Sequence, residues 1–297
     1  MFIDIHQHHS PKPGAPLTPE LQKKWGFHYT SPEETIKHYD GVGVEKAVIL
    51  PIGSPEAMRI GDPLNSEGAL KLAYEYPDRF IPFCNLDPRR MFNTPTAPLG
   101  KYLECMKDRG AKGVGEMVAN LPFLDPRMAN LFHFCEEFEM PVLFHIAPIL
   151  GGTYGVYDDP GLPQLEMSLM RFPKMIFIGH AQAFWSEIGT LETPMGRGGY
   201  QRNPVKEEGV LPKLLRKYPN LVCDLSANSG YWAMARDRAF AMHFLEEFSD
   251  RVMFGSDMSL AKPTPLMELL LDARGKDLSE ETFQKVCRLN AIRILKL

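Results

Sequence analysis

Phe2-Ile3-Asp4-Ile5-His6-Gln7-His8, near the start of the chain, is a short apolar run that ends in two histidines. A run of this length and composition is typical of a buried β-strand, which we expect over residues 2–6. Residues two apart on a strand point to the same face, so the imidazoles of His6 and His8 can address one ion. Two inward imidazoles without a partner would be costly to bury, which favours a metal site over simple packing.

Seven similar apolar runs follow along the chain. Continuous apolar runs of this kind are typical of parallel strands that are buried on both faces. Together with the first run, we expect strands at residues 2–6, 46–51, 79–85, 111–117, 140–146, 174–180, 220–226 and 251–257.

Helical signals lie between these strands. Ser31-Pro32-Glu33-Glu34 combines an N-cap, a proline at the first helical position and a glutamate that can complete a capping box. Asp125-Pro126 opens a helix in the same way, and Ser279 can cap one near the C-terminus. Residues 167–170 are rich in methionine and are expected to pack a helix into the core.

Eight alternations of strand and helix predict a single (β/α)₈ TIM barrel over residues 1–297, in the α/β class. The rival is a doubly wound open sheet, but no Gly-x-Gly-x-x-Gly follows any expected strand. Long connections at residues 9–30, 147–160 and 181–205 follow strands, on the side where barrel enzymes build their sites.

Composition limits the class of protein. The chain has 297 residues, 44% of them hydrophobic, and a net charge of −4, which disfavours a dedicated nucleic-acid-binding role. Since no apolar run approaches the roughly 20 residues of a membrane span and no signal peptide is recognised, we expect a cytoplasmic protein with no membrane partner. Five widely separated cysteines, without a Cys-x-x-Cys pair, argue against a disulfide framework and a thiolate zinc site.

Other expected strands also end in ionisable residues. Each of these residues closes an otherwise apolar run, and chance alone would rarely place histidine at three strand ends of eight. Together they form a cluster of nitrogen and oxygen donors suited to zinc, manganese, iron or nickel rather than calcium. The expected metal ligands are His6, His8, Glu116, His145, His180 and Asp257.

With these residues the chain resembles the amidohydrolase superfamily, in particular the branch called amidohydrolase family 2. Asn85-Leu86-Asp87-Pro88 after the third strand and Asn290-Ala291-Ile292-Arg293 near the end add to the resemblance. That branch includes hydrolases, lactonases and non-oxidative decarboxylases. In its mononuclear members the resemblance implies metal ligands at His6, His8, His145 and Asp257, with His180 as a catalytic or supporting group.

Glu116 has two readings. Metal-dependent deoxyribonucleases, which are related, use a glutamate on the fourth strand to bridge two metals, and Glu116 lies where that carboxylate would sit. Alternatively, Glu116 supports a ligand or contacts the substrate. Lys112 stands four residues earlier, at the start of the strand, and is badly placed for the carboxylated lysine that other members of the superfamily use. We include Glu116 among the expected ligands, so one or two ions can bind.

The expected chemistry is hydrolysis of a small amide, ester, lactone or phosphodiester. A divalent ion, with zinc as the first choice, lowers the pKa of its water from about 15.7 to about 7. Asp257 would accept the proton of that water, and His180 would stabilise the developing negative charge. The alternative is a metal-dependent non-oxidative decarboxylase of an aromatic or unsaturated acid, favoured by a single ion beside a basic residue. A third reading is an inert metal- or ligand-binding barrel.

The substrate is expected to be a small molecule. Arg197, Trp185 and Tyr154 follow strands and are candidates for the wall of its pocket. Arg197 is of most interest, because substrates in the resembled branch often carry a carboxylate, which arginine binds in a forked fashion. His133 and His243 fall within helical patterns and are expected to have no role in the site. Barrels of this kind commonly form homodimers, which we also expect here.

Overall fold

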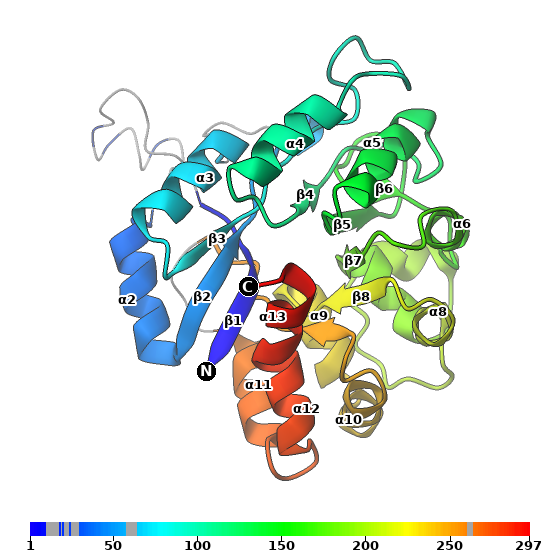
Figure 1. The fold of residues 1–297 in the computed structure, drawn as a ribbon. Coiled ribbons are helices and arrows are strands. Elements are labelled where there is room, and N and C mark those ends of the chain that lie inside the picture. Colours follow the sequence, from blue (N-terminus) through cyan, green and yellow to red (C-terminus); the bar gives the residue numbers. More distant parts are fainter. Residues whose placement is uncertain (10–17, 19, 21–23, 25–29, 58–63, 260–263) are drawn as a thin grey trace.

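Each of the eight apolar runs contributes a parallel strand to the computed structural model, which describes residues 1–9, 18, 20, 24, 30–57, 64–259 and 264–297. Figure 1 shows these strands gathered at the centre of the molecule with helices around them. The strands are β1 (Phe2–Gln7), β2 (Val44–Ile49), β3 (Phe80–Pro82), β4 (Val114–Met117), β5 (Val142–Ala147), β7 (Phe177–His180), β8 (Leu221–Asp224) and β9 (Val252–Met253). A further short strand, β6 (Val156–Tyr157), pairs with β5.

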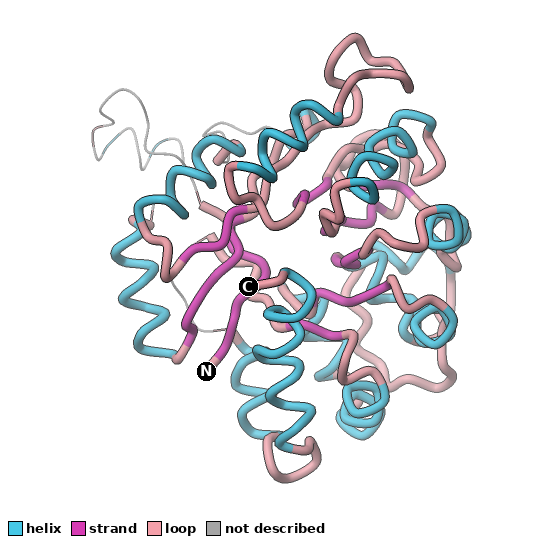
Figure 2. Tube along the Cα trace, viewed as in Figure 1, coloured by secondary structure: helices cyan, strands magenta, loops and turns pink. Residues whose placement is uncertain are grey.

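The strands follow one another in the order of a (β/α)₈ barrel, as the sequence predicts. They form two parallel sheets, β1-β2-β3 and β4-β5-β7-β8-β9. Isolated parallel bridges link the two sheets, from Cys84 to Val114 at one seam and from Gln7 to Met258 at the other. The strands therefore sit inside the layer of helices, with loops joining the two layers (Figure 2).

Most of the helices begin at residues that the sequence marks as caps. The Ser31 hydroxyl accepts a hydrogen bond from Glu34 N, while the Glu34 carboxylate accepts one from Ser31 N, so the predicted capping box is confirmed. Asp125 and Ser279 also cap helices. The helices are α2 (Pro32–Val42), α3 (Ser66–Glu75), α4 (Gly100–Asp108), α5 (Pro126–Glu137), α6 (Pro163–Arg171), α7 (Gln182–Trp185), α8 (Val210–Lys217), α9 (Ala227–Ala235), α10 (Arg238–Glu247), α11 (Pro265–Ala273), α12 (Glu280–Gln284) and α13 (Asn290–Leu295).

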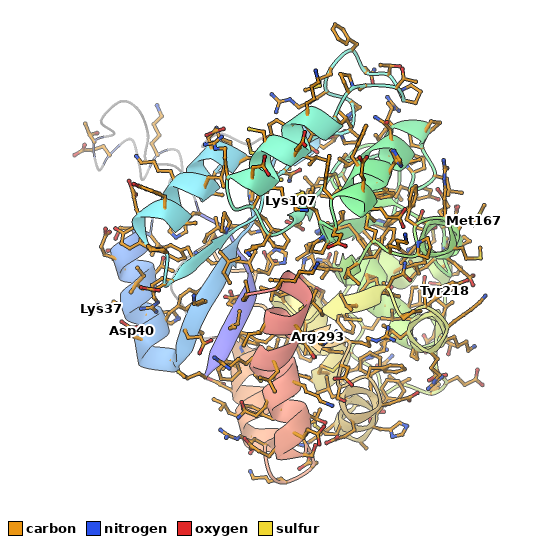
Figure 3. The ribbon with its side chains drawn as sticks, in the orientation of Figure 1. Lys37, Asp40, Lys107, Met167, Tyr218 and Arg293 are labelled. Carbon is orange, nitrogen blue, oxygen red and sulfur yellow. The ribbon has the colours of Figure 1, made fainter. Side chains whose placement is uncertain are left out.

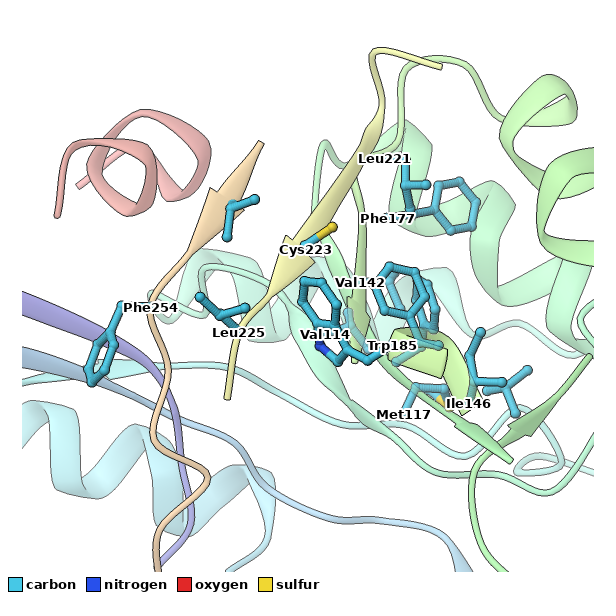
Figure 4. Close-up of a cluster of buried hydrophobic side chains, with 14 of the residues drawn as sticks. Val114, Met117, Val142, Ile146, Phe177, Trp185, Leu221, Cys223, Leu225 and Phe254 are labelled. Atoms are coloured by element: carbon cyan, nitrogen blue, oxygen red, sulfur yellow. The ribbon is translucent and has the colours of Figure 1, made fainter. Parts of the chain in front are cut away.

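Two hydrophobic clusters hold the barrel together. The inner cluster takes alternate residues of the strands, such as Ile3, Leu143 and Ile178, and includes Leu295 of α13. The outer cluster fills the space between strands and helices, and Figure 4 shows part of it around Val142 and Phe177. Alternation on each strand thus sends every second side chain to each cluster.

Other expectations meet different outcomes. Met167 and Met170 of α6 are 51% and 56% exposed, so the prediction that they pack in the core is wrong; Figure 3 shows Met167 at the surface. The helix turns Leu165 and Leu169 inward instead. Most of the connection at residues 9–30 lies outside the described residues. In the part of the chain that the structure describes, no helix is long and apolar enough to cross a membrane.

Candidate metal centre

The inner face of the barrel changes from apolar to ionisable where strands reach their carboxyl ends. On β5 the inner residue Leu143 is followed two positions later by His145, and on β7 Ile178 is followed by His180. His145 and His180 face each other in the register of the two strands. Parallel strands therefore bring side chains from distant parts of the sequence to one end of the barrel.

His6 and His8 meet at the same end. Their Nε2 atoms lie 3.0 Å apart. Backbone hydrogen bonds fix this segment to the one after β9, since His6 O accepts from Asp257 N at 2.8 Å and His8 N donates to Met258 O at 3.0 Å. The Asp257 side chain is thereby placed beside the two imidazoles.

The contacts of the other ring nitrogens decide what the two Nε2 atoms can do. His6 Nδ1 lies 2.5 Å from Asp224 Oδ2, and His8 Nδ1 lies 3.0 Å from the carbonyl oxygen of Leu50. Both oxygens act as acceptors, so both Nδ1 atoms carry the hydrogen and both Nε2 lone pairs point toward each other. Two lone pairs at this separation repel unless a cation, a proton or a metal ion, lies between them.

Two carboxylates complete the group around these nitrogens. Glu116 Oε2 lies 3.3 Å from His8 Nε2 and 3.7 Å from His6 Nε2. Asp257 Oδ1 lies 3.3 Å from His8 Nε2 and 3.4 Å from His6 Nε2. Four donors in tetrahedral array around an ion with bonds of about 2.0–2.2 Å stand about 3.3–3.6 Å apart. The donor set therefore fits one divalent metal ion.

The second oxygen of Glu116 faces another pair of histidines. Glu116 Oε1 lies 2.8 Å from His145 Nδ1 and 3.9 Å from His180 Nε2. The structure thus brings all six expected ligands into overlapping groups whose donor atoms lie within 4.8 Å of one another. Their role as ligands stays a prediction, because geometry alone does not say which of them an ion selects.

Exposure marks the side from which a substrate can approach. The side chain of Asp257 is 29% exposed, that of His8 16% and that of His145 12%. His6, Glu116 and His180 are buried. The ring of Tyr154 lies 4.7 Å from the ring of His145, centroid to centroid. This open side therefore presents a carboxylate, two imidazoles and an aromatic ring.

The pKa values of the cluster express the same need for a cation. Burial by itself lowers the pKa of His8, but hydrogen bonds to Asp257 and Glu116 outweigh burial and raise that pKa to about 9. Burial likewise opposes the charged form of Glu116, yet its contacts with His145 and His6 hold its pKa well below the usual range. In the absence of metal, protons supply the positive charge that the carboxylates require.

The raised pKa of His8 predicts how the stability of the metal-free protein depends on pH. The contribution of His8 is fully present below its unfolded pKa of 6.5 and is lost as the pH rises through about 9. We therefore expect the melting temperature of the metal-free protein to fall between pH 6.5 and 9. Thermal melts across this range test the expectation, and His8→Gln should flatten the profile. An unchanged slope in His8→Gln would contradict the assignment.

Asp224 is the site residue that the sequence analysis missed. Its Oδ2 accepts a hydrogen bond from the Ser226 hydroxyl at 2.7 Å, and its carbonyl accepts one from Trp185 Nε1 at 3.0 Å. A signal was present, because Asp224 stands two residues after the inner residue Val222 and closes an apolar run as His180 does. The expected strand continued to Ser226, which hid this position inside the run.

The three expected substrate residues lie in different surroundings. Tyr154 is half-buried against His145, as described above. Trp185 is 2% exposed and packs in the outer cluster, so its link to the site runs through the carbonyl of Asp224. Arg197 is also 2% exposed and donates to the carbonyl of Asp158 at 2.7 Å, with Glu187 3.9 Å away. For Trp185 and Arg197 the structure thus provides packing partners rather than an open pocket wall.

Gly255 supports the centre from behind. A Cβ at this position would lie 2.5 Å from Asp224 Oδ1 and 3.0 Å from His6 Cβ. Gly255→Ala is therefore expected to destabilise the fold by about 1–3 kcal/mol and to weaken metal binding, because these two side chains must move. Gly41→Ala is the matched control, since a Cβ at Gly41 in α2 meets nothing within 4 Å and should be neutral or slightly stabilising. Chemical denaturation and metal titration of both variants measure the difference.

Solved structures of similar fold cover nearly the whole chain. A probable 2-pyrone-4,6-dicarboxylic acid hydrolase from Acinetobacter baumannii is 13% identical with a TM-score of 0.58, covering 100% of this chain and 99% of that chain. A 2,6-dihydroxybenzoate decarboxylase from Rhizobium is 15% identical with a TM-score of 0.56, covering 99% and 98%. A 5-carboxyvanillate decarboxylase from Novosphingobium aromaticivorans, complexed with manganese, is 18% identical with a TM-score of 0.56, covering 94% and 88%. At these identities the likeness shows the fold.

Two further comparisons concern the sequence itself. A search of curated proteins found no match. The model of the amidohydrolase family, in contrast, matches residues 3–297, which include all six expected ligands. The chain belongs to the amidohydrolase family.

Proposed function

We propose that the protein is a metal-dependent non-oxidative decarboxylase of a small aromatic or unsaturated carboxylic acid. The observation that carries the proposal is the spacing of four donors from His6, His8, Glu116 and Asp257, which suits a single ion. The aromatic ring of Tyr154 at the open side suits a flat, unsaturated substrate. Two of the three solved structures named above are decarboxylases of aromatic acids, which supports this reaction over the hydrolysis placed first from the sequence.

The four donors would hold a divalent ion, which supplies positive charge to bind and orient the carboxylate of the substrate. Zinc was the first choice from the donor types alone. The 5-carboxyvanillate decarboxylase was solved with manganese, so manganese is the second ion to test. Nitrogen and oxygen donors accept both ions.

The chain's own residues must then move one proton. In the overall reaction the bond between the substrate carbon and its carboxylate breaks, CO₂ leaves, and a proton takes its place on that carbon. Asp257 is the most exposed member of the cluster and is placed to deliver this proton. Although burial opposes ionisation, the charge of His6 and the contact with His8 keep the pKa of Asp257 low, so Asp257 must receive the proton during turnover. His180 Nε2, 4.0 Å from Asp257 Oδ2, is the adjacent group that can supply it.

The test is a product assay on the protein loaded with Mn²⁺ or Zn²⁺. Hydroxybenzoates with a hydroxyl next to the carboxylate are the substrates to offer, and released CO₂ with the decarboxylated phenol is the expected result. In D₂O the product should carry one deuterium at the carbon that lost its carboxylate. Turnover of lactones or esters without CO₂ release would overturn the proposal in favour of hydrolysis.

Hydrolysis remains the second candidate because of Glu116. Its two oxygens face different pairs of histidines, His6 with His8 and His145 with His180, as a carboxylate between two ions would. Elemental analysis of the wild type and of Glu116→Ala separates the cases. About two ions per chain that fall to one would support a binuclear hydrolase, whereas one ion in both proteins would support the decarboxylase.

A further inference from the structure

We propose that Asp224 is a positioning residue that holds two histidines of the site at once, the expected ligand His6 and the expected proton donor His180. One oxygen, Asp224 Oδ2, lies 2.5 Å from His6 Nδ1 and 3.1 Å from His180 Nδ1. His6 is expected to bind metal and His180 to serve the reaction, so a single carboxylate serves both tasks. Only the turnover arm of the test below rests on the proposed function.

The chemistry of the carboxylate fixes how both rings are protonated. An ionised carboxylate only accepts hydrogen bonds, so each Nδ1 that faces Asp224 carries a hydrogen. Each Nε2 is then left with a lone pair, and both Nε2 atoms point to the side of Glu116 and Asp257. A supporting acceptor of this kind orients the ring of a ligating histidine and raises its basicity.

Asp224 is itself held in place from several directions. Its side chain is fully buried, and its Oδ1 accepts a hydrogen bond from Ser226 N at 3.0 Å. The hydroxyl of Ser226 also lies 3.1 Å from His6 Nδ1 and 3.0 Å from His180 Nδ1. With Trp185 Nε1 on its carbonyl and no room at Gly255, Asp224 has little freedom to move. The two rings are therefore oriented by a rigid group.

Asp224→Asn removes this arrangement with almost no change in size. An amide offers one accepting oxygen, and its NH₂ group must face either the two imidazoles or Ser226 N–H. In the first case the NH₂ group forces the hydrogen of His6 onto Nε2 and blocks metal binding, and in the second it meets another donor. We expect the dissociation constant for Zn²⁺ to rise by about 10- to 100-fold, as is typical when a supporting residue is lost.

Asp158→Asn is the matched control. Asp158 is also fully buried, and its carboxylate accepts hydrogen bonds from Gln164 N and Leu165 N at the start of α6. The change should lower stability through the same loss of an acceptor. It should leave the Zn²⁺ dissociation constant unchanged, because Asp158 contacts none of the expected ligands in the described part of the chain.

The experiment measures Zn²⁺ affinity and the imidazole N–H protons of the zinc-loaded, ¹⁵N-histidine-labelled protein by NMR. In the wild type we expect two slowly exchanging Nδ1–H protons, from His6 and His180, assigned with His180→Gln. Asp224→Asn should lose both signals and weaken affinity, whereas Asp158→Asn should keep both. An Asp224→Asn protein with wild-type affinity and both signals would overturn the proposal.

A second variant and a kinetic readout complete the test. Ser226→Ala keeps the carboxylate but removes the hydroxyl that contacts both rings, and we expect a smaller loss of Zn²⁺ affinity, about 3- to 10-fold. If decarboxylation is found, kcat of Asp224→Asn at saturating metal should fall while KM changes little, because His180 is misplaced as well. If no acid is decarboxylated, the affinity and NMR results still decide the role of Asp224.

Discussion

The double variant His6→Ala, His8→Ala is expected to lose its bound divalent metal. The two Nε2 atoms 3.0 Å apart are the nitrogen donors of the four-donor group, and the two carboxylates alone would bind an ion weakly. Since loss of a merely supporting residue typically costs 10- to 100-fold in affinity, we expect a loss of at least about 10³-fold here. Elemental analysis after dialysis, at equal protein concentration, measures the effect.

The control for this variant is His133→Ala, His243→Ala. Both histidines are on the surface, on α5 and α10, with side chains 64% and 78% exposed, so their removal should leave metal content unchanged. Circular dichroism should show that all variants remain folded. His8→Gln, which alters only a partly exposed side chain, gives a second reading if the loss of buried His6 disturbs folding. Metal at the wild-type level in the double variant would refute the proposed centre.

Asp257→Asn is expected to have the largest effect on turnover. An amide cannot carry the proton that replaces the departing carboxylate, and it is a weaker ligand than a carboxylate. General acid–base groups typically contribute 10²- to 10⁴-fold, so we expect kcat to fall by about 10³-fold. Metal content should fall less than in the double histidine variant, since His6, His8 and Glu116 remain.

Asp250→Asn is the control for this change. Asp250 lies on the surface with its side chain 61% exposed, where it pairs with Lys285, and its loss should leave kcat unchanged. The kinetics should be measured at saturating metal, so that a weaker ligand is not mistaken for a slower reaction. If Asp257→Asn kept more than about a tenth of the wild-type kcat, Asp257 would not be the proton carrier.

Local sequence was enough to predict the fold, for a physical reason. A parallel strand buried on both faces must be a short apolar run, and a helix between two strands must begin at a cap. Both features are written in neighbouring residues, so β1, the capping box at Ser31 and the helix start at Asp125 follow from the chain alone. The failure at Met167 and Met170 concerns which face of α6 is buried, a matter that composition does not settle.

The members of the candidate site could also be found from the sequence, because they occupy one kind of position. Each of the six closes an apolar run, and the barrel carries all such positions to one end. Their convergence in overlapping groups agrees with that expectation. The structure does not decide which of them bind metal.

Only the tertiary structure decided how these residues act on one another. The contact of Asp224 with both His6 and His180 joins segments 218 and 44 positions apart in the sequence, and no local pattern encodes such a distance. The same holds for Arg197, whose guanidinium turns toward Asp158 and Glu187 rather than toward the centre. The sequence by itself determined which donors reach the end of the barrel, because strand alternation is local. Packing of the whole chain determined their partners, spacing and charge.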